Sequence, residues 1–497
     1  MSTAIHTTSR TSETNALYST GVISSTLVSI HNDLSNAPLS TVSKSLITSS
    51  TSLFALLASP GTGFLADRLG RKPVLLLASC LFIIGALAQA VSTTVWAMIV
   101  GRSVVGLAIG SASFVAPLYI SELAPRKLRG RLVVVQVLFI SGGQVVAYVI
   151  GWVLSTAFGG WRWMVGLGAL PAIMQVVLLA VMPESPRWLF KRGAVGQAEA
   201  VLQKVYASSR SKDIVQGVLR AIQKEQDEEE SQEDSVDDED SSSTRKRTLL
   251  PRNIRQLFST HSQRRALAIA CFLQGAQQLC GFNSVMYFAA TIFSLAGFHS
   301  PTLPALTIAM TNFLFTFIAF YAIDRIGRRR ILLYAIPFMA LGLTLCAVAF
   351  SSLSSTVDDH GSTSINAPPS SISTATTTVQ ASDTLRFTTL LLPALLLYVA
   401  TYAISLGSLP WLQSELFPTR TRAVGAALAT TTNWTANTIV SASFLPALQT
   451  LGPSVTFAGY AAVCVVVWVG VAWGYPEVGN SRLEEVQKIM ERRWKVW

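Results

Sequence analysis

Long apolar runs, separated by short polar segments, most constrain the fold of this chain. Eleven runs come near the ~20 residues that a helix needs to cross a bilayer. Such segments must be helical, because hydrocarbon offers the backbone no other hydrogen-bond partners. A twelfth candidate, residues 16–30, is shorter and more polar. The eleven runs are 43–66, 73–92, 95–119, 132–157, 163–182, 266–293, 301–323, 331–350, 388–412, 423–447 and 455–475.

The composition agrees with a membrane protein. Half of the 497 residues are hydrophobic and 13% are charged, whereas soluble domains have about 25% charged residues. The net charge is +11, but no basic, aromatic-interleaved surface indicates nucleic-acid binding. The five cysteines lie in apolar runs at unrelated spacings, which indicates neither disulfides nor a metal site. We expect a lipid bilayer as the surroundings, with no metal, cofactor or nucleic acid.

The basic residues alternate between two sets of loops, and this predicts the topology. By the positive-inside rule the basic set is cytoplasmic. With residues 16–30 as the first span, the chain has six plus six spans and both termini in the cytoplasm. We expect a monomeric, multi-pass protein of the plasma membrane. The basic set holds Arg68, Arg71, Lys72, Arg126, Lys127, Arg129, Arg131, Arg325, Arg328, Arg329, Arg330, Arg420, Arg422 and the tail, and the other holds Lys44, Arg162 and Arg386.

Three motifs occur twice. The two copies of the first motif given below are 257 residues apart, and those of the other two are 293 residues apart. The difference, 293 − 257 = 36, matches the length of the Ser/Thr-rich stretch 351–386. The register predicts two homologous halves with a site between them near the midplane, the common plan of transporters with internal repeats. The pairs are Asp67-Arg68-Leu69-Gly70-Arg71-Lys72 with Asp324-Arg325-Ile326-Gly327-Arg328-Arg329, Ser121-Glu122-Leu123-Ala124-Pro125-x3-Arg129 with Ser414-Glu415-Leu416-Phe417-Pro418-x3-Arg422, and Pro183-Glu184 with Pro476-Glu477.

The repeat divides the chain into four parts. The linker begins with an amphipathic helix at 196–206 and includes the acidic run 225–240, which we expect to be solvated and disordered. We expect 351–386 to be a flexible external loop. The four parts are an N-terminal six-helix half at 1–182, a cytoplasmic linker at 183–263, a C-terminal six-helix half at 264–475 and a cytoplasmic tail at 476–497.

The apolar run 266–293 is unusually rich in amides. Gln278, Asn283 and Tyr287 are five and four residues apart, so they share a broad helix face. Polar groups in hydrocarbon are costly unless they meet partners or a wet cavity, and amides offer donors and acceptors to hydroxyls. The stretch predicts a site for a polar, uncharged ligand. The alternative is that these amides only join neighbouring helices.

Taken together, these motifs resemble the sugar porter branch of the major facilitator superfamily over residues 17–490. Within it, residues 281–288 and 409–418 are most similar to fungal myo-inositol transporters. The resemblance implies an all-α membrane protein of twelve transmembrane helices that moves a neutral polyol or sugar by alternating access. It favours myo-inositol as the substrate and implies symport with protons. The motifs are the two Asp-Arg-x-Gly-Arg loops, the fourth-span residues Gly106, Gly110, Tyr119, Glu122 and Arg129, and Pro183-Glu184-Ser185-Pro186-Arg187.

The resemblance also assigns substrate contacts. Two departures disfavour a glucose-type pocket, although a hexose facilitator stays an alternative. The fifth-span glutamine of hexose porters is replaced by Val137, after Gln136, and Trp411 lies four rather than five residues before Glu415. The implied contacts are Gln144, Gln277, Gln278, Asn283, Tyr287, Asn312, Trp411, Asn433 and Trp434.

Charged residues at the inner helix ends predict a gate. Opposite charges there can pair across the two halves and hold the cytoplasmic side shut, a two-state element that substrate can bias. The alternative is that the arginines only fix the topology. The expected gate residues are Asp67, Arg71, Glu122, Arg129, Glu184, Arg187, Asp324, Arg328, Glu415, Arg422 and Glu477.

The first span departs from the proton-linked pattern. Proton-linked members carry Gly-Tyr-Asp-Thr-Gly, whereas here Ser19 replaces the acid. Arg102, its usual neighbour, is present, and an embedded arginine normally needs a carboxylate. A serine cannot carry the coupled proton, so either the protein is a passive uniporter with a shortened first helix or the true chain starts elsewhere. A carrier-like nutrient sensor is the rival of another class, and no catalytic set indicates an enzyme.

Overall fold

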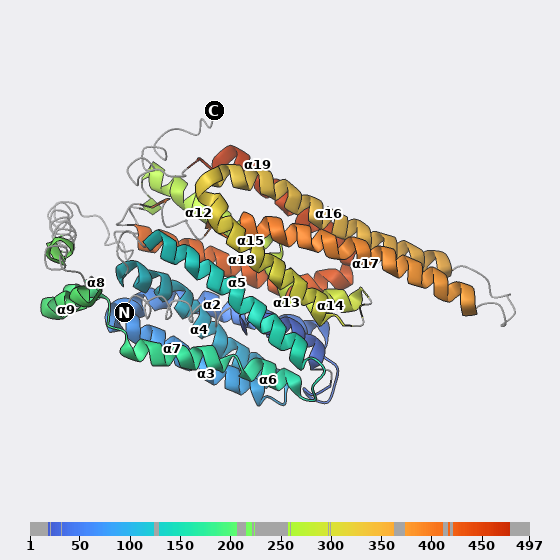
Figure 1. The fold of residues 1–497 in the computed structure, drawn as a ribbon, viewed down its shortest axis with the longest axis horizontal. Helices are drawn as coiled ribbons and strands as arrows, with labels where there is room; N and C mark the ends of the chain where they lie inside the picture. Colours follow the sequence, from blue (N-terminus) through green and yellow to red (C-terminus); the bar gives the residue numbers. More distant parts are fainter. Residues whose placement is uncertain are drawn as a thin grey trace, which may run out of the picture.

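The computed structural model describes most of the chain as α-helices, and no strand occurs in the part that it describes. Turns and short loops join the helices. The helices lie side by side in one elongated bundle (Figure 1). The described residues are 18–19, 21–30, 32–123, 129–205, 215–220, 223, 257–258, 260–296, 298, 300–361, 373–410, 416–417 and 421–477.

Within the described residues, the helices of the bundle form two sets of six paths, when each broken helix counts as one path. The predicted twelve-helix, all-α fold is therefore confirmed. The first set is residues 21–29, α2 (Thr41–Leu69), α3 (Arg71–Ala90), α4 (Val95–Leu123), α5 (Arg129–Leu154), and α6 (Gly160–Gly166) with α7 (Ala169–Val181). The second is α12 (His261–Leu279) with α13 (Phe282–Tyr287) and α14 (Ala289–Leu295), then α15 (Thr302–Ile326), α16 (Arg328–Gly361), α17 (Ser373–Ile404), α18 (Arg422–Thr450) and α19 (Pro453–Gly474).

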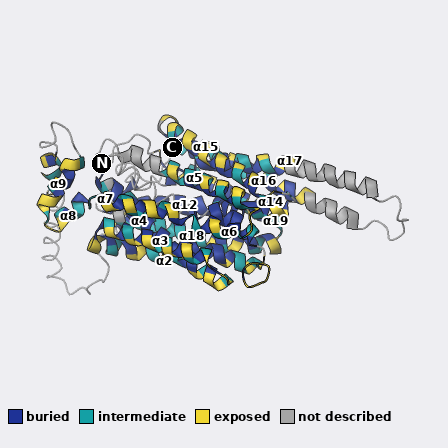
Figure 2. Cartoon of the chain, turned by 60° about the horizontal axis from the view of Figure 1, so that its bottom comes forward, coloured by how far each residue is buried: buried dark blue, intermediate teal, exposed yellow. Residues whose placement is uncertain are grey.

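The outer surface of the bundle suits a membrane. Within the described residues, seven helical segments are long and apolar enough to cross a bilayer, and the bent path through α12, α13 and α14 makes up to eight. Large side chains such as Phe64, Trp96 and Val181 point outwards, at 70%, 72% and 82% exposure, and exposed positions alternate with buried ones along each helix (Figure 2). A surface this apolar is expected where lipid replaces water.

Two closely packed helix pairs connect the halves. Helix α2 packs along α18, and α5 packs along α15. We call the end of the bundle where α2 ends and α3 begins the charged end, because it carries the Asp67–Lys72 loop and Glu184; the other is the opposite end. Helices α8 (Pro186–Lys191) and α9 (Val195–Val205) lie outside the bundle beyond the charged end (Figure 1).

The glycines of the fourth-span motif allow α4 to approach α2 closely. A Cβ at Gly110 would lie 2.3 Å from the Ala55 carbonyl oxygen, and one at Gly106 would lie 2.4 Å from that of Thr51. Both distances are far inside van der Waals contact, so only glycine fits. The close packing of α4 on α2 therefore requires glycine at both positions of the motif.

The segments between the spans differ in part from expectation. Helix α9 occupies the predicted amphipathic stretch and buries Ala198, Val201 and Leu202. The prediction of a loop at 351–386 is wrong for the residues of this stretch that the structure describes, because α16 continues to Gly361 and α17 begins at Ser373. Residues 225–240 lie outside the described residues.

Candidate functional site

Five amide side chains from three helices form one hydrogen-bonded network near the middle of the bundle. Asn433 of α18 lies at its centre. Its Nδ2 donates to Oε1 of Gln274 at 2.6 Å and to Oε1 of Gln277 at 2.8 Å, and its Oδ1 accepts from Nε2 of Gln278 at 3.0 Å. Asn283 of α13 then donates to Oε1 of Gln278 at 2.6 Å. We call these five residues the amide cluster.

The amide cluster is fixed from a neighbouring helix path. Nε2 of Gln277 donates to the Leu406 carbonyl at 2.9 Å, and Nε2 of Gln274 donates to that of Pro410 at 3.1 Å. Both carbonyls lie beyond the end of α17 at Ile404, outside that helix's regular hydrogen bonding. Both glutamines are more than 95% buried, so the network is ordered before any ligand arrives.

A break in the seventh path adds Asn283 to the cluster. Helix α12 ends at Leu279, and Gly281 takes a φ of 88° in the left-handed region, which favours glycine. The Tyr398 hydroxyl donates to the Cys280 carbonyl at 2.9 Å, and the Tyr402 ring stacks on Phe282 at 3.8 Å between centroids. The break therefore turns Asn283 back toward Gln278.

Two further pairs involve amides, and one of these pairs joins the two halves. Nδ2 of Asn312 on α15 donates to Oε1 of Gln144 on α5 at 3.1 Å, and Nδ2 of Asn437 on α18 donates to the Tyr287 hydroxyl at 3.4 Å. Two of their buried atoms, Nε2 of Gln144 and Oδ1 of Asn437, have no hydrogen-bond partner among the residues that the structure describes. A hydroxyl group can satisfy both kinds of atom, because it donates and accepts.

The structure thus brings together most of the predicted contact residues and adds two. The additions are Gln274 and Asn437, and each lies at helical spacing, three or four residues, from a predicted amide. Trp434 instead packs against the apolar cluster that contains Phe82 and Val105. Trp411 lies outside the described residues. Within the described part of the chain, no group of His, Cys, Asp or Glu could hold a metal ion.

The Arg102 side chain is buried beside Ser19 and is only 2% exposed as a residue. Its Nη1 donates to the Ser19 hydroxyl at 2.9 Å and to the Ser19 carbonyl at 3.3 Å, and its Nε donates to the Ile47 carbonyl at 3.2 Å. A cavity of about 10 Å³ adjoins it, and its described lining holds no carboxylate. Neutral oxygens therefore solvate this guanidinium where the related proton-linked pattern has an acid.

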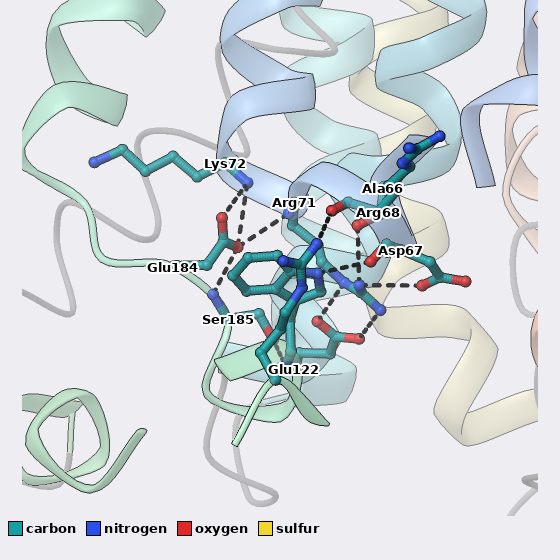
Figure 3. A network of polar contacts seen from close by, with 10 residues as sticks. Ala66, Asp67, Arg68, Arg71, Lys72, Glu122, Glu184 and Ser185 are labelled. Atoms are coloured by element: carbon teal, nitrogen blue, oxygen red, sulfur yellow. Dashed lines mark hydrogen bonds and ion pairs between the residues drawn. The ribbon is translucent and has the colours of Figure 1, made fainter. Parts of the chain in front are cut away.

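At the charged end, Arg71 is the centre of a compact ionic network (Figure 3). Its Nε and Nη2 bind the two carboxylate oxygens of Glu122, both at 3.0 Å, and its Nη1 lies 3.1 Å from Asp67. The paired side chains of Arg71 and Glu122 are 10% and 7% exposed. The two-point geometry makes this a strong, directional pair.

Glu184 binds the start of α3 in the same network (Figure 3). Its carboxylate accepts from the backbone N–H of Arg71 at 3.0 Å and from that of Lys72 at 3.2 Å. A carboxylate is favoured there, because the first N–H groups of a helix lack intrahelical partners and carry partial positive charge. Glu477 repeats the arrangement in the other half, accepting from the backbone of Arg328 at 3.0 Å and of Arg329 at 3.2 Å.

This geometry corrects the predicted pairing. Arg71, Asp67 and Glu122 pair within the N-terminal half, not across the two halves, and Glu184 and Glu477 each cap a helix of their own half. Arg422 donates to the Phe417 carbonyl at 3.4 Å, also within one half. The side chains of Arg129, Asp324 and Glu415 lie outside the described part of the chain. The motifs therefore build rigid corners within the halves.

Gly70→Ala is expected to destabilise the charged end by about 1–3 kcal/mol, the usual cost of a strained backbone conformation. Gly70 has a φ of 106°, and a Cβ there would lie 2.5 Å from Oε2 of Glu184. Thermal unfolding in detergent measures the effect. The matched control is Gly61→Ala in α2, where a Cβ meets nothing within 4 Å and alanine favours the helix. Equal melting temperatures for the two variants would contradict the prediction.

Two six-helix halves around a buried, uncharged amide site define a membrane carrier of the major facilitator type. Its sequence matches the family described as "Sugar (and other) transporter" over residues 5–490. The chain therefore belongs to this family of sugar transporters, which are carriers rather than enzymes.

Individual relatives and structures agree with this assignment. The chain is 38% identical over 475 residues to Myo-inositol transporter 2 of Schizosaccharomyces pombe, covering 96% of this chain and 79% of that protein. It is 39% identical over 480 residues to Myo-inositol transporter 1 of Candida albicans, covering 96% and 81%. The E. coli xylose transporter XylE, in a partially occluded inward-open conformation, shares the fold with a TM-score of 0.73 at 22% identity, covering 95% of this chain and 99% of that one.

Proposed function

We propose that this protein carries myo-inositol across the plasma membrane by alternating access between its two halves. The unpaired Gln144 and Asn437 atoms carry the proposal, because they place a donor and an acceptor for hydroxyls in a buried, uncharged setting. The two yeast relatives, named as myo-inositol transporters, support the choice of polyol. A hexose remains the alternative substrate.

The amide cluster suits a neutral, hydroxyl-rich ring. A charged ligand would need a compensating ion, and the cluster of Gln274, Gln277, Gln278, Asn283 and Asn433 holds none. A polyol hydroxyl can exchange with the amide–amide bonds, since both partners donate and accept. We infer that the substrate takes over part of the network that the amides satisfy among themselves in this structure.

The same proposal gives the protein an orientation. The charged end carries Arg68, Arg71 and Lys72 in one half and Arg325 and Arg328 in the other. The positive-inside rule places such loops in the cytoplasm, so both termini are cytoplasmic and the opposite end faces outwards. The bonds between Gln449 and Thr41 and between Asn312 and Gln144 then join the halves at the outer face and in the middle.

Transport is proposed to be passive. The Ser19 hydroxyl occupies the place beside Arg102 where a coupled carrier needs an acid, at 2.9 Å from the guanidinium. A hydroxyl cannot exchange a proton near neutral pH. The substrate gradient alone therefore drives uptake, and protons are not a partner.

Uptake into proteoliposomes tests the proposal. Purified protein is expected to take up radiolabelled myo-inositol saturably, with glucose a weaker competitor. Gln278→Ala is expected to lower kcat/KM by at least about tenfold, because roughly 1.4 kcal/mol of lost hydrogen bonding corresponds to that factor. The matched control is Gln203→Ala, an exposed glutamine on α9 outside the bundle. Absence of saturable myo-inositol uptake, or unchanged uptake by Gln278→Ala, would refute the assignment.

A further inference from the structure

The guanidinium of Arg102 carries more N–H groups than the protein around it binds. A guanidinium has five N–H donors. The three on Nε and Nη1 donate to the hydroxyl and the carbonyl of Ser19 and to the carbonyl of Ile47. The two on Nη2 have no partner among the residues that the structure describes, and neither has the proton of the Ser19 hydroxyl. Three polar hydrogens therefore remain available beside a positive charge.

Arg102 and Ser19 both line the cavity of about 10 Å³ between the first helix, α3, α4 and the path through α6 and α7. Much of the other lining is apolar, as at Phe82 and Val105. Its remaining polar side chains donate to backbone carbonyls, and Oε1 of Gln89 is enclosed by protein atoms. The donors that can serve a ligand here are therefore those of the guanidinium and the hydroxyl.

The positive charge of Arg102 has no compensating charge in the described part of the chain. An arginine stays protonated in proteins, and this one is only 2% exposed. It forms no ion pair with a described residue, and the described lining of the cavity holds no carboxylate. A buried charge with only neutral partners is strongly destabilising. The site therefore favours a ligand that brings a negative charge.

The size of the cavity limits which anion can enter. A volume of about 10 Å³ holds one particle of about the size of a water molecule, so phosphate, a carboxylic acid anion or a polyol does not fit. A water molecule would bind the available hydrogens, but it would leave the charge uncompensated. A monatomic anion meets both requirements, since it accepts hydrogen bonds from any direction and carries one negative charge.

We propose that a chloride ion binds in this cavity, held by Nη2 of Arg102 and by the Ser19 hydroxyl. The ion takes the place that an acid at residue 19 has in the proton-linked pattern. Ser19, Ile47 and Arg102 all belong to the N-terminal half, so the ion moves with this half and is not carried across the membrane. Chloride then stabilises the contacts of the first helix and α2 with α4, apart from the amide cluster.

Thermal unfolding of the full-length protein in detergent tests the chloride site. Chloride at about 0.1 M is compared with gluconate at the same ionic strength, so that the screening of surface charges is equal. Gluconate is too large for the cavity. Chloride is expected to raise the melting temperature of the wild type by about 2–4 °C, and saturably, because a ligand that binds only the folded state stabilises it.

Substitutions at two positions separate this site from a general effect of chloride. Ser19→Asp supplies an attached negative charge beside Arg102, so it is expected to melt at the same temperature in both salts, and in gluconate at least as high as the wild type. Ser19→Ala leaves the cation and the room for the ion, and is expected to keep the shift at a higher half-saturating concentration. Arg102→Gln is expected to lose the shift, and it decides the question should Ser19→Asp fail to fold.

Equal melting temperatures of the wild type in chloride and gluconate would mean that the cavity holds only water, and would overturn the proposal. A shift of full size in Ser19→Asp would also overturn it, because the ion would then act elsewhere. The measurement needs no substrate, so its failure is distinct from that of the proposed function. A chloride shift in a protein that takes up no myo-inositol would leave the anion site standing and refute only the substrate.

Discussion

Arg71→Gln is expected to lower the free energy of unfolding by about 3–5 kcal/mol, the usual cost of removing one partner of a buried ion pair. The Glu122 carboxylate, on a side chain only 7% exposed, would lose both of its bonds to the guanidinium. Asp67 would also lose its partner, but its side chain is 65% exposed and water can solvate it. The cost therefore comes almost entirely from Glu122.

Unfolding by titration with a denaturing detergent measures this loss. Arg68→Gln is the matched control, because Arg68 lies three residues earlier with an exposed side chain, and exposed charges contribute little. Adding Glu122→Gln to Arg71→Gln is expected to recover part of the stability, since no uncompensated charge then remains buried. If the single variant were as stable as the control, the pair would not hold this end together.

The sequence identifies which residues form the ionic network at the charged end, but it does not identify which of them pair with each other. The four-residue spacing of Asp67 and Arg71 is a local signal that an ion pair can form on one helical turn. The partner Glu122 comes from α4 and Glu184 from the connection between α7 and α8, whereas the repeat alone suggested pairing between copies of the motif. The structure shows why the copies stay separate. Glu184 and Glu477 each neutralise a helix start in their own half.

At the amide site, too, the sequence identifies the residues but not their contacts. Gln277, Gln278 and Asn283 are identifiable because amides are conspicuous in an apolar run. Their connection to Asn433 depends on how closely α12 approaches α18, a distance that no local pattern encodes. The break at Gly281 has a sequence signal, since glycine accommodates a positive φ. The bend between α13 and α14 has none, because the hydroxyls that bind its backbone, those of Tyr148 and Ser24, are more than 130 residues away.

The residue at position 19 is the basis of the proposal that transport is passive. Arg102 is solvated there by one hydroxyl and two carbonyl groups, so the bundle tolerates the cation without an acid. Passive transport brings the substrate to equal concentrations on both sides. Coupling to one proton across a gradient of one pH unit would add about 1.4 kcal/mol, which is a tenfold accumulation. The two modes are therefore easily distinguished.

Ser19→Asp is expected to convert passive uptake into proton-driven accumulation. The new carboxylate would lie where the Ser19 hydroxyl now accepts from Arg102, and it can bind and release a proton as the halves alternate. In proteoliposomes whose outer solution is one pH unit more acidic than the lumen, the wild type is expected to equilibrate myo-inositol. The variant is expected to approach tenfold accumulation inside. Ser19→Asn, which is polar but cannot titrate, should behave as the wild type. Accumulation by the wild type itself would show that Arg102 works with a proton carrier other than residue 19.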